Sequence, residues 1–159
     1  LLIGKTVVLS PYAQSLPPVP KAYWIKLTQK LNDMGWSVCT NAFGPQLPIP
    51  DTEKIELPFC LLEQFFNMAG YLVSLRSGMD DITHNSICKR VEVYAENTVK
   101  RSLVVSAIEC FSYSDHPIIV SIDNIDICVE ETLLQLGLCG SASSGIYQKN
   151  TENEAALKT

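Results

Sequence analysis

The chain has 159 residues, of which 47% are apolar and 18% are charged, and this balance excludes an intrinsically disordered protein. Its 12 basic and 17 acidic residues give a net charge of −5 without a basic stripe, which argues against nucleic acid as the main partner. No apolar run reaches the ~18 residues of a membrane-spanning helix.

The first predicted elements are a strand, a loop, a helix and a second strand. The β-branched run Thr6–Leu9 ends at a Ser-Pro pair and predicts a buried strand. Four prolines in residues 11–20 indicate a loop. From Lys21 onward apolar residues recur at helical spacing as far as Gly35, a residue typical of helix ends. With a strand over 36–40, this order has the length of one βαβ unit.

The next predicted elements continue the alternation of strands and helices. They are a loop over 41–54, a short edge strand over 55–57, a helix from Pro58 that stops at Gly70, a nearly all-apolar strand over 71–75, a short helix from about Asp80 to Cys88 and a strand over 91–94. Strands as apolar as residues 71–75 are typical of parallel sheets covered by helices on both faces.

The last third of the chain is less regular. Residues 102–111 fit a helix or a strand, residues 118–121 a strand, and Glu130 to Leu136 a helix that stops at Gly137. We therefore predict one doubly wound, Rossmann-like α/β domain over residues 1–140, with a three-layer α/β/α arrangement. Residues 141–159 are polar and are expected to form a frayed tail.

The six cysteines, at positions 39, 60, 88, 110, 128 and 139, contain no CxxC pair and predict neither a zinc site nor a redox pair. Most lie in apolar stretches, so we interpret them as reduced and the protein as cytoplasmic. No signal peptide is recognisable at the start, and the first residue is not Met, which indicates a piece of a larger protein.

Three loops are the candidate ligand sites, because ligands of open parallel sheets bind beyond the carboxyl ends of the strands. They are Ser10 to Ser15, Thr40 to Gly44 and Arg76 to Asp81. In the third, glycine allows close approach of a ligand, and free backbone N–H groups at the following helix start favour an anion such as phosphate. Arg76 and Ser77 would add a guanidinium and a hydroxyl.

The same turn has a purely structural interpretation. The run Ser77-Gly78-Met79-Asp80 fits a capping box, in which Ser77 caps the helix and Asp80 reaches back to it. Asp80 and Asp81 would then supply the negative charge that a helix start favours. The sequence leaves both interpretations open.

These residues together resemble a known family. The run Val7-Val8-Leu9-Ser10-Pro11, the proline-rich loop, the helix with Tyr23-Trp24 and the stretch from Met68 to Gly78 resemble the start of the C-terminal half of GT-B glycosyltransferases. The closest resemblance is to the heptosyltransferase-like group, over roughly residues 5–95. Arg76 stands where that family usually carries Asp, and the place after Gly78 where the family carries His holds Met79-Asp80-Asp81.

The resemblance implies a nucleotide-sugar-binding domain of an enzyme of polysaccharide biosynthesis, which transfers a sugar to a glycan or lipid acceptor. The nucleotide-diphosphate sugar would be a substrate, with no cofactor or metal. The ligand-binding residues would be Ser10, Tyr12, Asn41, Arg76, Ser77, Gly78, Met79 and Asp80. The acceptor-binding N-terminal half, which usually carries the catalytic base, would be a missing partner domain, so no catalytic residue is assigned. The alternative is a non-catalytic Rossmann-like or flavodoxin-like ligand-binding or interaction module.

Overall fold

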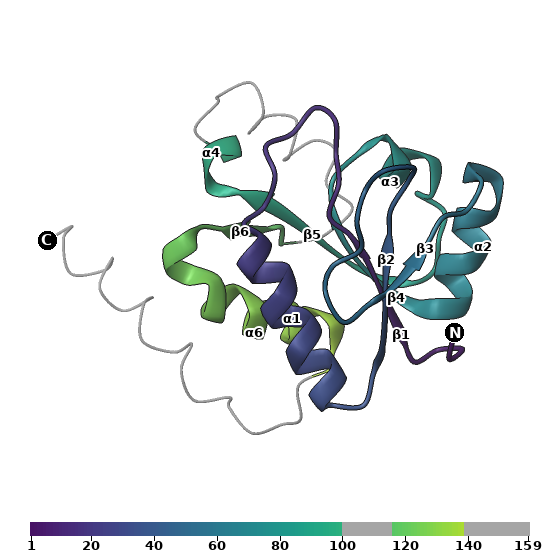
Figure 1. Cartoon of the computed structure of the whole chain (residues 1–159), viewed down its shortest axis with the longest axis horizontal. Helices are drawn as coiled ribbons and strands as arrows, with labels where there is room; N and C mark the ends of the chain where they lie inside the picture. Colours follow the sequence, from purple (N-terminus) through teal and green to yellow (C-terminus); the bar gives the residue numbers. More distant parts are fainter. Residues whose placement is uncertain (100–115, 139–159) are drawn as a thin grey trace, which may run out of the picture.

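A parallel β-sheet forms the centre of the computed structural model, which describes residues 1–99 and 116–138 (Figure 1). Within these residues the sheet has six strands in the order β3-β2-β1-β4-β5-β6, and every neighbouring pair is parallel. Two halves therefore run outward from β1 and β4, which is the strand order of dinucleotide-binding folds. The predicted doubly wound, Rossmann-like α/β fold is confirmed.

The strands are β1 (Thr6–Ser10), β2 (Ser37–Asn41), β3 (Glu53–Ile55), β4 (Gly70–Leu75), β5 (Lys89–Ala95) and β6 (Ile118–Val120). The helices are α1 (Lys21–Asp33), α2 (Phe59–Ala69), α3 (Gly78–Ile82), α4 (Glu96–Val99) and α6 (Ile125–Leu136), with a 3₁₀ turn, η1 (Ile122–Asn124), before the last.

Helices cover both faces of the sheet and complete the three layers (Figure 1). On one face α1 and α6 pack side by side on a mainly apolar surface around Leu9, Trp24 and Leu133. On the other face α2 packs around Val8 and Phe66. Burial of these large side chains, each worth about 1.5–3 kcal/mol, is the main stabilising contribution to the fold.

Most predicted elements are confirmed within one or two residues at each end, and three of them differ in ways that matter for the fold. The edge strand lies at Glu53–Ile55, two residues before its predicted position. The third helix spans Gly78–Ile82, so it begins two residues before Asp80 and does not extend to Cys88. The last helix begins at Ile125, five residues before Glu130. The predictions for residues 102–111 and for the tail over 141–159 lie outside the described residues.

The start of β4 has a glycine that the backbone requires. Gly70 ends α2 with a φ of +96°, a left-handed conformation that side chains rarely adopt. A Cβ built there would lie 3.2 Å from the Cα of Gly4, whose amide donates to the Met68 carbonyl. The turn before β1 therefore packs directly on the junction of α2 and β4.

None of the helices described here is long and apolar enough to cross a lipid bilayer.

Candidate functional site

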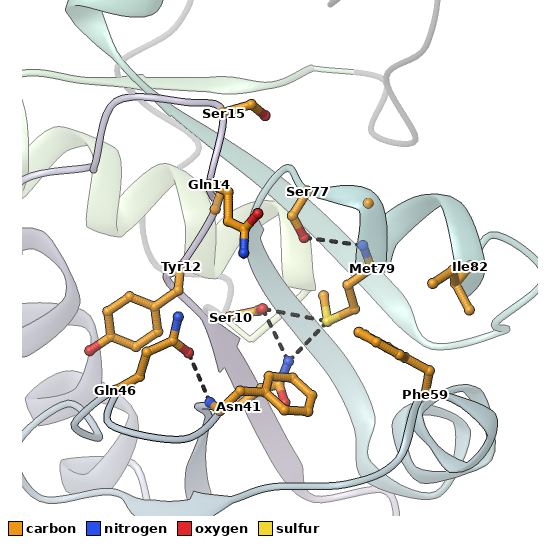
Figure 2. A pocket seen from close by; sticks show the side chains of 13 residues that line it. Ser10, Tyr12, Gln14, Ser15, Asn41, Gln46, Phe59, Ser77, Met79 and Ile82 are labelled. Atoms are coloured by element: carbon orange, nitrogen blue, oxygen red, sulfur yellow. Dashed lines mark hydrogen bonds between the residues drawn. The ribbon is translucent and has the colours of Figure 1, made fainter.

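An open pocket of about 650 Å³ lies at the carboxyl ends of β1, β2 and β4 (Figure 2). After β1 the chain runs to α1 on one face of the sheet, and after β4 it runs to α3, which contacts α2 on the other face. The loops after β1 and β4 therefore diverge and leave a crevice between them. This volume is within the range of small-molecule sites. The fold therefore places a pocket where open α/β sheets bind their ligands.

The lining of the pocket contains no charged side chain among the described residues. It consists of Ser10, Tyr12, Ala13, Gln14, Ser15, Asn41, Phe43, Gln46, Phe59, Ser77, Gly78, Met79 and Ile82. Hydroxyl and amide groups alternate there with aromatic and aliphatic ones. Such a surface suits a neutral, hydrogen-bonding ligand or the neutral part of a charged one.

Ser10, Asn41 and Met79 form a buried polar cluster at the floor of the pocket (Figure 2). The Asn41 Nδ2 donates to the Met79 sulfur at 3.0 Å and to the Ser10 Oγ at 3.4 Å. The Ser10 hydroxyl also donates to the sulfur, at 3.5 Å. Two strong donors therefore converge on a thioether, which is a weak acceptor.

Two phenylalanines and Ile82 give the pocket an apolar wall. Phe43 follows β2 and Phe59 begins α2, and their ring centroids lie 5.6 Å apart at 36°. Phe59 remains 55% exposed. Exposed aromatic rings beside a polar floor are suited to cover the flat face of a heterocycle or a sugar ring.

Hydrogen bonds hold the rim of the pocket. The Tyr12 hydroxyl, on the loop after β1, donates to the Leu47 carbonyl on the loop after β2. The Gln46 side chain accepts from the Phe43 amide at 2.8 Å. The first contact ties the two loops together and the second orders the loop after β2, so the Tyr12 side of the pocket is shaped before a ligand binds.

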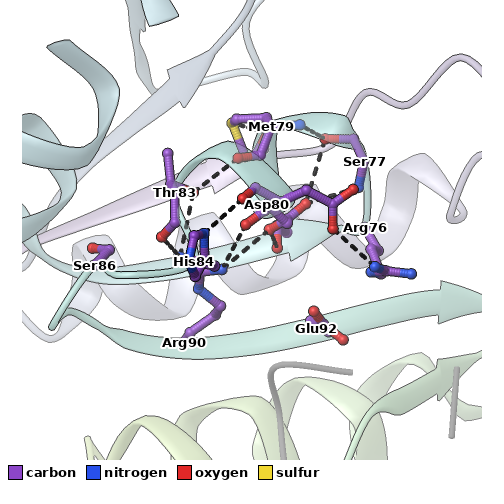
Figure 3. Close-up of polar contacts among 12 residues, drawn as sticks. Arg76, Ser77, Met79, Asp80, Thr83, His84, Ser86, Arg90 and Glu92 are labelled. Atoms are coloured by element: carbon purple, nitrogen blue, oxygen red, sulfur yellow. Dashed lines mark hydrogen bonds and ion pairs between the residues drawn. The ribbon is translucent and has the colours of Figure 1, made fainter. Parts of the chain in front are cut away.

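The turn after β4 is closed by a complete capping box (Figure 3). The Ser77 Oγ accepts from the Met79 amide, and the Asp80 carboxylate accepts from the Ser77 amide at 2.8 Å. Asp80 is fully buried and also accepts from the Ser74 hydroxyl at 2.7 Å. The capping interpretation is confirmed, and two of the amides expected to face an anion are already hydrogen-bonded.

Arg76 lies beside the pocket and does not line it. Its guanidinium donates to the Asp81 carboxylate at 2.9 Å, and only 19% of its side chain is exposed. Figure 3 shows it on the side of the turn that faces Glu92 of β5. The positive charge expected to meet a phosphate is therefore directed to Asp81.

Burial and neighbouring charges act against each other at Asp80. Burial raises the pKa of its carboxyl, while the hydrogen bonds from Ser74 and Ser77 and the charge of Arg90 partly offset this rise. The Arg90 guanidinium lies 3.9 Å from the Asp80 carboxylate and donates to the Thr83 carbonyl. These contacts make Asp80 a structural residue that orders α3 behind the pocket.

Six of the eight predicted ligand-binding residues line the pocket: Ser10, Tyr12, Asn41, Ser77, Gly78 and Met79. Arg76 and Asp80 do not. The sequence interpretation missed Gln46, Phe59 and Ile82, which lie beyond the three candidate loops or on helices. A Phe at the first turn of α2 carries no sequence signal for a ligand, because it fits an apolar helix face equally well.

No metal centre is identified among the described residues, which contain no group of three His, Cys, Asp or Glu side chains suited to hold an ion. Of the cysteines, Cys39 and Cys128 are buried, and Cys60 is exposed. Burial raises the pKa of the Cys39 thiol to about 12. Cys39 is therefore an apolar side chain of the sheet and not a nucleophile.

No protein-family model, curated protein or solved structure shows a significant match to the chain.

Proposed function

We propose that this chain is the nucleotide-sugar-binding domain of a GT-B-like glycosyltransferase of polysaccharide biosynthesis. The observation that carries the proposal is the polar pocket at the switch point between β1 and β4, lined by Ser10, Ser77 and Gly78. This position fits a nucleotide in open α/β sheets. The protein would transfer the sugar to a glycan or lipid acceptor.

The neutral lining determines how the donor would lie. The base and a sugar ring would enter the pocket, against the Phe43–Phe59 wall, because these groups carry no charge. The diphosphate would stay near the mouth, over Gly78, where nothing lies within 4 Å of a built Cβ. Arg76 would meet the phosphates only by leaving Asp81, and it would then stabilise the charge of the leaving group.

The remaining parts of the enzyme would lie in another domain. The acceptor and the catalytic base would belong to a partner domain that precedes this one, and the donor domain would need no metal. A cytoplasmic location accords with the free thiols of Cys39, Cys60, Cys88 and Cys128.

A second candidate function is a ligand-binding module without chemistry of its own. It is favoured by the capping box, which uses the Ser77 and Met79 amides, and by the pairing of Arg76 with Asp81. Such a module would bind a neutral sugar or nucleoside and show no preference for a diphosphate.

Calorimetric titration of the full chain with UDP, GDP, ADP and CMP tests the proposal. We expect one nucleoside diphosphate to bind more tightly than the matching nucleoside. Gly78→Ala adds one methyl group where the structure has open space, and the backbone there does not require glycine. It should leave stability intact and weaken binding by about 1–3 kcal/mol, because the methyl group would take space that the diphosphate is proposed to fill.

The matched control is Ile127→Ala, an exposed position on α6 that does not line the pocket. It should leave the affinity unchanged. If no nucleotide releases or absorbs heat at millimolar concentration, the donor-binding proposal is wrong. Equal affinity for the nucleoside and its diphosphate would favour the module without chemistry.

A further inference from the structure

We infer that the floor of the pocket is a subsite for ligand hydroxyl groups, which the Met79 side chain closes until a ligand displaces it. This inference rests on the proposed function, and it names the part of the donor that reaches the floor. The group that would bind there is a pair of neighbouring hydroxyls, and it could belong either to the ribose of the nucleotide or to the transferred sugar.

The first observation is the unmet hydrogen-bonding capacity of Asn41. The residue is 4% exposed and lines the pocket, and its Oδ1 is buried without a hydrogen-bond partner. Because the thioether is an acceptor, the amide presents Nδ2 to the Met79 sulfur and turns Oδ1 away from it. A buried carbonyl left without a donor costs about 1–3 kcal/mol, which a ligand hydroxyl would recover.

The second observation is that a weak acceptor occupies two good donors. The Asn41 Nδ2 and the Ser10 Oγ both point at the Met79 sulfur (Figure 2). An oxygen acceptor would bind both more strongly than a thioether does. Replacing the sulfur by a ligand oxygen is therefore favourable for both donors.

The third observation is that Met79 is suited to move. Its side chain is unbranched, with three rotatable bonds, and adapts to irregular space. It belongs to α3, a helix of only five residues, and borders the open volume of the pocket. A rotation of the side chain toward the Phe59 and Ile82 wall would keep it in apolar surroundings and open the floor.

A hydroxyl pair matches this floor better than a phosphate does. A hydroxyl both accepts and donates, so one ligand hydroxyl would accept from Asn41 Nδ2 and its neighbour would donate to Oδ1. Phosphate oxygens at neutral pH only accept, and they would face the unpaired Oδ1 with repulsion. The uncharged lining leads to the same choice, since a buried phosphate charge would have no counter-ion there.

The experiment measures the affinity of each ligand probe for the wild-type chain and for each of its variants. The probes are UDP and GDP, their 2′-deoxy forms, UDP-glucose and GDP-mannose, and D-glucose and 2-deoxy-D-glucose. The variants are Asn41→Leu, which keeps the volume and removes donor and acceptor, and Ser10→Ala, which removes a single hydroxyl. Folding of each variant is checked by its circular dichroism and its urea midpoint.

We expect Asn41→Leu to weaken a fully hydroxylated probe about tenfold, the effect of about one hydrogen bond, and its deoxy counterpart less than about twofold. Ser10→Ala should give the same pattern with a smaller change, and it serves if Asn41→Leu does not fold. Met79→Leu, which fills similar space without an acceptor, should tighten the hydroxylated probe about threefold. If Asn41→Leu weakens UDP and GDP but not their 2′-deoxy forms, the subsite binds the ribose. If it weakens UDP-glucose or GDP-mannose and leaves UDP and GDP unchanged, the subsite binds the transferred sugar.

Equal losses for hydroxylated and deoxy probes would overturn the hydroxyl subsite while leaving nucleotide binding intact. If no nucleotide binds but D-glucose binds more weakly to Asn41→Leu and 2-deoxy-D-glucose does not, the proposed function is wrong and the subsite stands. If no probe shifts the Ser10 and Asn41 amide signals of the wild type, the inference is overturned as well.

Discussion

Arg76 and Asp81 form an ion pair beside the pocket, and under the proposed function this pair would set how strongly the site attracts phosphate. While Asp81 holds the guanidinium, a ligand phosphate must compete for it. The pairing therefore reduces the binding free energy that a direct charged hydrogen bond, worth about 1.5–3 kcal/mol, would supply.

Asp81→Asn is expected to tighten the binding of a nucleoside diphosphate by up to about 1 kcal/mol, the upper range for an exposed ion pair. Asp81 is 57% exposed, so the substitution should leave the fold intact. Calorimetry measures the change. Asp33→Asn, at the C-terminal end of α1 and outside the pocket lining, controls for the loss of one negative charge. Unchanged affinity in Asp81→Asn would place the phosphates out of reach of Arg76.

Asp80 gives a prediction for pH dependence. Burial raises its pKa in the folded protein, so its contribution to stability is largest below the unfolded pKa and declines as the pH rises through the folded value. Asp80→Asn cannot ionise. We therefore expect the wild type to lose stability relative to Asp80→Asn over the pH range that begins at about 4, the ordinary pKa of an aspartate. Urea unfolding of both proteins across this range measures the difference, and a difference that grows in favour of the wild type would show that the Arg90 pairing dominates.

The junction of α2 and β4 depends on the backbone of Gly70. Gly70→Ala forces an alanine into a left-handed conformation and brings its Cβ to 3.2 Å from Gly4. We expect a loss of about 2 kcal/mol in the free energy of unfolding. Gly78→Ala is the matched control, since Gly78 has neither constraint, and it should change stability by less than about 0.5 kcal/mol. Equal effects at both positions would contradict this account of the junction.

The packing of α1 on α6 includes a buried hydrogen bond. The Tyr23 hydroxyl and the Thr132 hydroxyl lie 2.7 Å apart, and burial raises the pKa of Tyr23, which keeps its proton. Exposed ion pairs join Lys26 to Asp126 and Lys30 to Glu130 along the same two helices. The helices therefore meet through one specific polar contact inside and two charged ones outside.

Tyr23→Phe is expected to lower the free energy of unfolding by about 1 kcal/mol, because it removes one buried hydrogen bond and little volume. Tyr12→Phe is the matched comparison, since its hydrogen bond to Leu47 is exposed, and its effect should stay below about 0.5 kcal/mol. Chemical unfolding measures both. A larger loss for Tyr12→Phe would mean that the rim, and not the helix pair, limits stability.

The alternation of apolar runs and glycine stops was sufficient to predict the doubly wound sheet. Gly35, Gly70 and Gly137 all adopt positive φ at helix ends, where a local rule applies. The end of α3 was not predictable in this way. The Thr83 carbonyl just after the helix accepts from Arg90 of β5, and Asp80 in the first turn accepts from Ser74 of β4. Such contacts exist only after the sheet has formed.

The candidate site was predictable where it depends on topology and not where it depends on side-chain partners. The rule that strand ends gather at one edge located Ser10, Asn41 and Gly78 in one pocket. The role of Arg76 depended on a choice between a ligand and Asp81, which the sequence leaves open. The neutral character of the lining could not be predicted either. It depends on which side chains from separate helices, such as Phe59 and Ile82, meet at the pocket.

Assigned amide spectra of the full chain, recorded during titration with UDP, GDP, ADP and CMP, locate any nucleotide on the molecule. We expect saturable shifts that cluster at Ser10 to Ser15, Asn41 and Ser77 to Met79, larger with one diphosphate than with its nucleoside. Saturable shifts elsewhere on the molecule, or none with any nucleotide at millimolar concentration, would contradict this expectation.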